Sequence, residues 1–473
     1  MNLPAHFLSN PAPSPIINLT PSACGNLFAS AEADGWRVWE SSSLSLVNVT
    51  GTCCLYSLVG VEEGTDTPNG SLSIALPLHQ TGLLFLIGGP PSPLYAPNKV
   101  ILYSLLTKST CASLEFQSAV LGICARRDRL LVILHNQAIL FAIQYDPPAI
   151  IREGAYETAD NPRGLGAIAT EAGSSLLCFP GRQTGQVAIV KLPSSSSPPS
   201  VRDPPYATTS ILLAHTTGLS ALGITPSGSH IATASNKGTL IRIYNPKTSA
   251  LLHELRRGTD TAEIFSLALR LDGLALACAS DKGTIHLWDL SPRPRQREPS
   301  EEGLISLKPY LPKYFSSSWS DAQFKLPPPE AQPAKSLPFL DAFADERLEK
   351  PKTVEEDKVM LVWTKARKAQ EQQYKDVEGR QERRVKREQA KKGAANTSIE
   401  VEEKKEYVLV AATHSGAWYK LAAFNDGGEE ATDDNKAQEK ARAKEQTAEG
   451  GYGAFGRCRL LDHKRFEQRD DDW

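Results

Sequence analysis

One β-hairpin pattern occurs twice near the middle of the chain. Residues 228–244 read GSHIATASNKGTLIRIY, and residues 273–288 read GLALACASDKGTIHLW. In both copies, small apolar residues alternate up to a serine, a Lys-Gly-Thr turn follows, and a second alternating run comes after the turn. This order predicts two antiparallel strands joined by a tight turn. The turn glycines Gly238 and Gly283 lie 45 residues apart, which is the length of one blade in a WD40-type β-propeller.

Five weaker copies of the same turn and strand occur elsewhere. They are DGWRVWE at Gly35, PNKVILYSL at Asn98, NQAILFAI at Asn136, TGQVAIVKL at Gly185 and SGAWYKLAAF at Gly416. With the two clear copies they make seven, a number that closes a propeller. We therefore predict an all-β fold, a seven-bladed WD40-type β-propeller with long inserted loops.

The spacing of the copies locates the longest insertion. The first six follow one another at intervals of 38 to 63 residues, whereas 133 residues separate Gly283 from Gly416. Residues 327–357 are rich in proline and acidic residues, and the stretch 364–392 holds 11 basic and 5 acidic residues. Such a composition is typical of a solvated helix or a disordered loop. The predicted organisation is a tail at 1–14, blades 1 to 6 at 15–326, a charged low-complexity insertion at 327–404, blade 7 with the closing strand at 405–466 including a polar insert at 426–449, and an acidic tail at 467–473.

Composition and motifs argue against several classes of protein. Lys plus Arg number 52 and Asp plus Glu 54, so the net charge near −2 does not suit a protein that coats nucleic acid. The first residues, MNLPAHFLSNPAPSP, lack the features of a signal peptide, and no apolar run is long enough for a transmembrane helix. The eight cysteines include no CxxC pair, so we expect reduced thiols, no bound metal and a cytoplasmic protein. Motifs for phosphate-cradling loops and catalytic nucleophiles are not found either, so we expect neither an enzyme nor a cofactor.

Two adjacent arginines, Arg256 and Arg257, end the strand-like run ALLHELRRG between the two clear hairpins. Successive side chains of a strand point to opposite faces, so the two guanidinium groups are expected to serve two different pockets. Each pocket would also contain hydroxyl side chains from one hairpin. An arginine with several hydroxyls suits a phosphorylated, sugar-like headgroup, because guanidinium binds phosphate through paired hydrogen bonds. The alternative is that the arginines only guard a solvated strand end and the hydroxyls only fill turns.

At these residues the chain resembles a known family. ELRRGTDTAEIFSLAL followed by ASDKGTIHLWDL is similar to the PROPPINs, phosphoinositide-binding WD40-type propellers with the signature Phe-Arg-Arg-Gly. The stretch PLYAPNKV at 93–100 is similar to their Hsv and short-WIPI branch in particular. Further similar stretches are GGPPSPLYAPNKVILY at 88–103, LEFQSAVLGICARRDRLLVIL at 114–134, NPRGLGAIA at 161–169, LLCFPGRQTGQVAIVKL at 176–192 and LPKYFSSSWSDAQFKL at 311–326. The resemblance covers about 15–326 and 405–466. Leu255 stands in place of the signature Phe and keeps an apolar anchor there.

The resemblance implies two lipid headgroup sites. The first falls on His215, Thr233, Ser235, Thr239 and Arg256, and the second on Arg257, Ser280, Thr284 and His286. Family members bind phosphatidylinositol 3-phosphate and phosphatidylinositol 3,5-bisphosphate through such sites and act in autophagy and in vacuolar or endosomal membrane traffic. By this resemblance the protein would be peripheral on vacuolar, endosomal or pre-autophagosomal membranes and monomeric in solution.

A loop at about 291–318 has the composition of a membrane anchor. Arginines at 293, 295 and 297 precede a run of apolar and aromatic side chains. Basic residues attract anionic headgroups, and the apolar residues can enter the acyl boundary. The residues expected to insert are Leu304, Ile305, Leu307, Tyr310 and Leu311. The alternative is a loop folded back onto the propeller, with Tyr314, Phe315 and Trp319 already part of a packed strand.

The two histidines in the proposed pockets suggest a pH dependence. A bound phosphate favours the protonated form of a nearby imidazole. We therefore expect lipid to bind more tightly near pH 6 than near pH 8 through His215 and His286.

Other functions stay open. A protein-interaction propeller could scaffold partners without lipid dependence. The segment Pro91 to Lys99, PSPLYAPNK, is the surface that the resemblance implies for an autophagy lipid-transfer protein. The basic stretch 364–392 could bind RNA or anionic membrane nonspecifically, or be only a solvated insertion. We expect no specific nucleic-acid partner.

Overall fold

Twenty-nine strands make up the described part of the chain, and these residues form no helix. The structure is a computed structural model. It describes residues 15–47, 70–145, 148–171, 174–192, 208–291, 317–327, 357–366, 407–424, 453–455 and 458–466. Within each sheet, short consecutive strands pair in the antiparallel direction through tight turns, as the hairpin pattern predicts.

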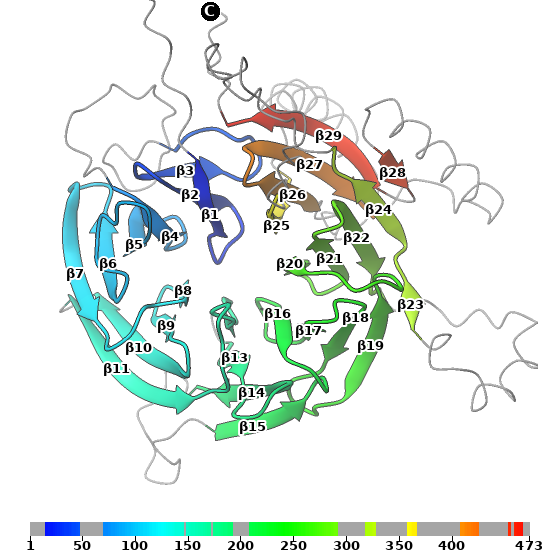
Figure 1. Cartoon of the computed structure of the whole chain (residues 1–473), viewed down its shortest axis with the longest axis horizontal. Helices are drawn as coiled ribbons and strands as arrows, with labels where there is room; N and C mark the ends of the chain where they lie inside the picture. The colour runs from blue at the N-terminus through cyan, green and yellow to red at the C-terminus, as the bar shows by residue number, and fades with distance from the viewer. Residues whose placement is uncertain are drawn as a thin grey trace, which may run out of the picture.

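The strands form seven sheets arranged as a ring of blades (Figure 1). Blade 1 holds β1 (Ile16–Pro21), β2 (Leu27–Glu32) and β3 (Trp36–Glu40). Blade 2 holds β4 (Leu72–Pro77), β5 (Leu83–Gly88), β6 (Lys99–Ser104) and β7 (Ser109–Glu115). Blade 3 holds β8 (Gly122–Arg126), β9 (Arg129–Ile133), β10 (Gln137–Tyr145) and β11 (Pro148–Glu157). Blade 4 holds β12 (Ala167–Ile168), β13 (Leu176–Pro180), β14 (Gln186–Lys191) and β15 (Thr208–Leu213).

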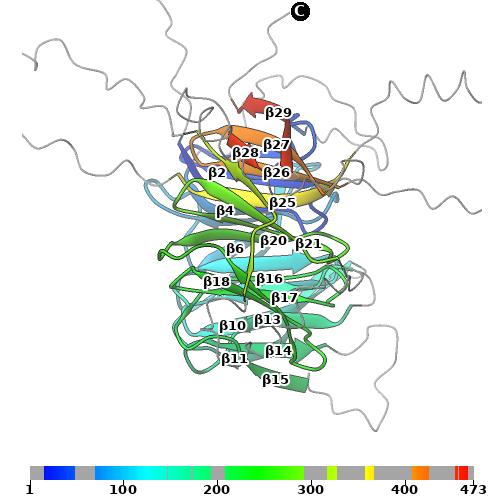
Figure 2. The ribbon, with the colours of Figure 1, turned by 90° about the vertical axis from the view of Figure 1, so that its right-hand side faces the viewer.

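The remaining blades include strands from distant parts of the chain. Blade 5 holds β16 (Leu219–Ile224), β17 (Ile231–Ser235), β18 (Leu240–Tyr244), β19 (Leu251–Arg256) and β23 (Ser318–Trp319). Blade 6 holds β20 (Ile264–Leu269), β21 (Ala275–Ser280), β22 (Thr284–Asp289), β24 (Ala322–Lys325) and β28 (Gly453–Phe455). Blade 7 holds β25 (Val359–Lys365), β26 (Tyr407–Thr413), β27 (Ala417–Ala423) and β29 (Cys458–Arg465). The side view shows the ring edge-on, as a disc that is narrower than it is tall (Figure 2).

The predicted seven-bladed propeller is confirmed. Each of the seven predicted turns joins the second and third strands of one blade. Gly238, between β17 and β18, shows why the turn needs glycine. Its φ is +62°, and a Cβ there would lie 1.9 Å from the carbonyl oxygen of Ala262. Any other residue would meet both backbone strain and a clash at this turn.

Apolar packing between neighbouring blades holds the ring together. Between blades 5 and 6, Ile241 and Leu255 pack with Trp288 in one buried cluster. The ring closes where blade 7 meets blade 1. There Phe466, which follows β29, stacks on Trp39 with ring centroids 5.1 Å apart. The closing strand predicted near the end of the sequence is thus β29, which pairs with β27 in blade 7.

The predicted boundary between insertion and blade 7 is wrong at one place. Strand β25, VMLVWTK, lies inside the segment 327–404 that was predicted to be low-complexity insertion, and it is the first strand of blade 7. Five apolar residues in a row drive its burial, but the proline-rich and charged residues around them hide so short a run in any composition average. The polar insert at 426–449 and both predicted tails lie outside the described residues.

Candidate functional site

Arg256 and Arg257 lie on opposite faces of blade 5, as strand alternation predicts. Leu255 belongs to the core cluster shared with blade 6, so its neighbour Arg256 lies on the other face, toward blade 4. Arg257 returns to the blade 6 side. Its backbone nitrogen donates to the Thr239 carbonyl at 3.0 Å. Burial, and after it the charge of Arg257, lowers the pKa of His286 on β22 of blade 6. The two guanidinium groups therefore belong to two different seams between blades.

The seam between blades 4 and 5 holds four of the five residues predicted for the first site: His215, Thr233, Ser235 and Arg256. His215, which follows the outer strand of blade 4, and Thr233 on β17 lie within hydrogen-bond distance, Nε2 to Oγ1 at 3.0 Å. Thr233 and Ser235 are buried. Thr239 is half-buried in the turn after Gly238 and lies opposite Arg257, so the structure does not bring it to the Arg256 face of the blade. Arg256 donates a 2.8 Å hydrogen bond from Nε to the Ser317 hydroxyl.

Arg242 is a cation of this seam that the sequence did not point out. It lies opposite Thr233 in the sheet, and its Nη1 donates to the Ala214 carbonyl at 2.7 Å. Its Nε pairs with Glu254 at 3.0 Å, so a carboxylate already balances its charge. Strand alternation in LIRIY could have placed Arg242 in this seam, because it puts Arg242 on the same face as Leu240 and Tyr244.

The seam between blades 5 and 6 holds the second predicted set. On β21 and β22, Ser280, Thr284 and His286 alternate with residues that pack toward blade 7, so they face blade 5 and Arg257. Ser280 is 2% exposed, and its hydroxyl has no hydrogen-bond partner among the described residues. A buried hydroxyl without a partner is costly, so this pocket suits a ligand that brings polar atoms.

Arg257 is the unusual group of this pocket. Its side chain is 6% exposed, and its Nε donates to the Gly238 carbonyl at 2.7 Å, while Nη2 donates to the Asp260 carbonyl. Within the described ranges no carboxylate pairs with it. Two carbonyl acceptors fix its orientation but leave its full positive charge uncompensated in a buried place. An anionic partner would offset the desolvation of such a charge.

Both pocket histidines are neutral near physiological pH. Burial lowers the pKa of His215 to about 4, with a further contribution from Arg242. Burial also lowers the pKa of His286 to about 4, with Arg257 contributing. Both rings are therefore uncharged at pH 6 and at pH 8 alike in the lipid-free protein. The expected gain in lipid binding near pH 6 therefore requires bound phosphate to raise the pKa of either ring from about 4 to about 6, a demand that the sequence alone did not reveal.

The predicted membrane loop is described only at its ends. Leu304, Ile305, Leu307, Tyr310 and Leu311 lie outside the described residues, as do Tyr314 and Phe315. Trp319 belongs to β23, which pairs in parallel with β19, and 47% of its surface is exposed. This residue is therefore part of a sheet without being buried in it.

The predicted partner segment, Pro91 to Lys99, is the loop between β5 and β6 of blade 2. Its first three residues are exposed. The backbone nitrogen and carbonyl of Ser92 both bond to Ser71, and Leu94 N donates to the Ser71 carbonyl at 3.1 Å. The loop is thus held against blade 2 by backbone bonds while it presents prolines outward.

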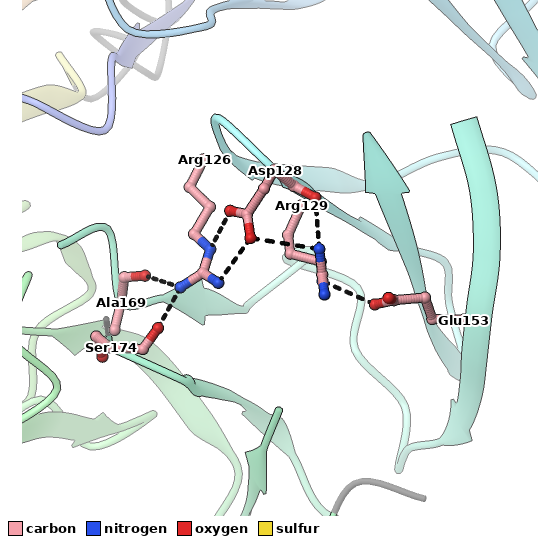
Figure 3. Close-up of polar contacts among 6 residues, drawn as sticks. All are labelled: Arg126, Asp128, Arg129, Glu153, Ala169 and Ser174. Carbon is pink, nitrogen blue, oxygen red and sulfur yellow. Dashed lines mark hydrogen bonds and ion pairs between the residues drawn. The ribbon is translucent and has the colours of Figure 1, made fainter. Parts of the chain in front are cut away.

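A second group of charged side chains lies between blades 3 and 4 (Figure 3). The residues drawn there are Arg126, Asp128, Arg129, Glu153, Ala169 and Ser174. Arg126 forms two bonds to the Asp128 carboxylate, at 2.7 and 3.1 Å, and also donates to two backbone carbonyls of blade 4. Arg129 pairs with Glu153 at 2.8 Å. Because both guanidinium groups already have carboxylate partners, this cluster fastens two blades and does not suit an anion.

Other kinds of site find no support among the described residues. They contain no group of three or more His, Cys, Asp or Glu side chains that could share a metal ion. The six cysteines in this part of the chain are free thiols. No helix there has the length and apolar character to cross a membrane.

The chain is similar in sequence and in fold to known proteins. A family model described as PROPPIN matches residues 94–320. SVP1-like protein 2 of Emericella nidulans is 34% identical over 277 residues, which are 55% of this chain and 81% of that protein. SVP1-like protein 2 of Pichia angusta is 33% identical over 265 residues, 55% of this chain and 71% of that protein. The solved structure of Kluyveromyces lactis Hsv2 with complete loop 6CD is similar in fold, with a TM-score of 0.56, 14% identity, and coverage of 96% of this chain and 100% of that chain.

Proposed function

Because the chain belongs to the PROPPIN family, we propose that it is a non-enzymatic phosphoinositide effector with two headgroup sites at its rim. The first site is His215, Thr233, Ser235 and Arg256, and the second is Arg257, Ser280, Thr284 and His286. The lipids are phosphatidylinositol 3-phosphate and phosphatidylinositol 3,5-bisphosphate. The protein acts in autophagy or in vacuolar and endosomal membrane traffic, peripheral on those membranes.

The observation that carries this proposal is the unpaired charge of Arg257. Every other guanidinium described above has a carboxylate or a side-chain acceptor, whereas Arg257 is buried with backbone carbonyls alone. A phosphate monoester would supply the missing negative charge through charge-assisted hydrogen bonds. The partnerless Ser280 hydroxyl in the same seam supports a ligand that also carries hydroxyl groups.

Liposome flotation tests the proposal. Wild-type protein is expected to float with liposomes that contain either phosphorylated lipid and to stay in solution with unphosphorylated phosphatidylinositol. The variant Arg256→Thr plus Arg257→Thr is expected to stay in solution with all three, because neither pocket keeps a cation for the phosphate.

A matched control removes the same charge elsewhere. Arg152→Thr plus Arg182→Thr changes two exposed arginines on blades 3 and 4, of which Arg182 pairs with the equally exposed Glu157. This control is expected to float like wild type. Flotation of the Arg256 and Arg257 variant at wild-type levels, or equal loss in the control, would contradict the proposed sites.

A protein partner is a second candidate function. The rigid, outward-facing loop Pro91 to Lys99 supports it, because a fixed backbone lowers the ordering cost of docking. A neighbouring solved structure is a complex of KlAtg21 with the coiled-coil of AgAtg16, with a TM-score of 0.50. We propose that this loop binds a protein of the autophagy machinery, such as a lipid-transfer protein. The scaffold function without lipid dependence is the correct one under two conditions. The variant Arg256→Thr plus Arg257→Thr must still bind the partner, and phosphorylated lipid must change partner binding in neither wild type nor the variant.

A further inference from the structure

A two-residue strand connects the two proposed pockets. β23 (Ser318–Trp319) pairs in parallel with β19, with Ser318 opposite Leu255 and Trp319 opposite Arg256. Directly after β23 the chain enters β24 of blade 6. Figure 1 shows β23 at the outside of the ring, between the ends of β19 and β24. The segment 317–320 therefore runs past both arginine-bearing seams.

Ser317, on one side of β23, contacts the arginine of the first pocket. The Arg256 Nε donates to its hydroxyl at 2.8 Å, and Ser317 is only 7% exposed. A hydrogen bond at Nε fixes the plane of the guanidinium group, because Nε lies in that plane and joins the aliphatic chain to the carbon that carries the two Nη groups. The Nη edge, which pairs best with phosphate, then has one defined direction.

Ser320, on the other side of β23, contacts the histidine of the second pocket. The His286 Nδ1 and the Ser320 hydroxyl oxygen lie 3.3 Å apart, and Gln323 Nε2 donates to the same oxygen at 2.8 Å. Because the amide of Gln323 occupies one lone pair, the serine can direct its own proton at Nδ1. The neutral imidazole then carries its proton on Nε2 and can donate there.

We propose that Ser317 and Ser320 are positioning residues, one for each headgroup site: Ser317 orients Arg256, and Ser320 fixes the ring and proton of His286. This inference rests on the proposed function. Neither serine needs to touch the lipid. Removing either hydroxyl weakens headgroup binding at its own site and leaves the other site unaffected, since the backbone pairing of β23 with β19 does not depend on these side chains.

The test measures each site alone with soluble dibutanoyl phosphatidylinositol 3-phosphate, using the full chain and isothermal titration. Arg257→Thr leaves only the first site, and Arg256→Thr leaves only the second. In the Arg257→Thr background, Ser317→Ala is expected to raise Kd at least about fivefold and Ser320→Ala less than about twofold, as for loss of one charge-assisted bond. In the Arg256→Thr background, Ser320→Ala is expected to raise Kd at least about fivefold and Ser317→Ala less than about twofold.

Ser318→Ala is the matched control, because Ser318 lies between the two positions in the same strand and is exposed. It is expected to leave both Kd values unchanged, and Ser317→Thr or Ser320→Thr, which keep a hydroxyl, are expected to restore most of the binding. If Ser317→Ala or Ser320→Ala weakens binding at both sites equally, the proposal is overturned and β23 has a merely structural role. If neither variant changes Kd at its own site, the proposal is overturned as well. Wild-type protein that binds no soluble lipid would instead overturn the proposed function itself.

Discussion

Charge balance at single residues separates structural arginines from those that suit a ligand. Arg126, Arg129 and Arg242 each have a carboxylate partner within 3.0 Å, so their burial is compensated inside the protein. Arg257 has backbone carbonyl acceptors instead and no carboxylate among the described residues. Since an uncompensated buried charge costs stability, its presence is best explained by a ligand that is absent from the free protein.

Histidine titration gives a prediction at this scale. The pKa of both pocket histidines is about 4 in the free protein. Bound phosphate raises these pKa values, so any gain in affinity would appear only as pH falls through the raised value toward 4. The phosphate monoester itself takes up a proton near pH 6, which removes charge from the ligand and weakens binding by about twofold at that pH. We therefore expect Kd for soluble phosphatidylinositol 3-phosphate to be equal or slightly larger at pH 6 than at pH 8.

Titration of wild type and His286→Gln at the two pH values checks this expectation. The glutamine variant keeps a hydrogen-bond donor but cannot titrate, so its Kd should change with pH as wild type does. A wild-type Kd several-fold smaller at pH 6, with no such change in the variant, would return histidine protonation to the mechanism.

At the scale of strands, the sequence predicted the turns and strand faces that depend on neighbouring residues. All seven second-to-third-strand turns were predictable because Lys-Gly-Thr and related turns lie between alternating runs. The split of Arg256 and Arg257 to two seams was predictable from strand alternation alone. Strand β23 was not, since two residues pair with a strand more than 60 positions earlier and carry no periodic pattern. Ser317 and Ser320 could therefore not be placed near Arg256 and His286 from the sequence.

Strand β25 gives the prediction at this scale. Trp363 is 2% exposed, and its Nε1 donates to the Ala268 carbonyl of blade 6 at 3.0 Å, so it joins two blades. Trp363→Ala removes this contact and leaves a large cavity, which we expect to destabilise the protein by about 3–5 kcal/mol. Urea unfolding measures the change. Lys365→Ala, at the exposed end of the same strand, is expected to shift the midpoint little. Equal midpoints for the two variants would place β25 outside the cooperative core.

At the scale of the whole ring, the two pockets are held at a fixed separation. Ser235 and Ser280 occupy equivalent positions at the ends of β17 and β21 in neighbouring blades, so the pockets open at the same end of the propeller. Stacking of Phe466 on Trp39 closes the ring between blades 7 and 1. A closed ring cannot spread its blades without breaking such a contact. Two sites in a rigid frame engage one membrane with a high effective concentration for the second headgroup.

This geometry predicts that a single arginine substitution has a small effect on binding of soluble lipid and a large effect on binding to liposomes. Arg256→Thr or Arg257→Thr alone should reduce the number of bound soluble lipids from two to one and leave the Kd of the remaining site unchanged. On liposomes with sparse phosphatidylinositol 3-phosphate, the same single variants should lose affinity by about 100-fold or more, because the second contact no longer adds to the first. Titration gives the first quantity and flotation over a range of lipid densities gives the second. One bound lipid per wild-type chain, or single variants that float as wild type does at low lipid density, would show that the seams do not act as a pair. The loss should shrink as the lipid density rises, since a single site then rebinds before the protein diffuses away.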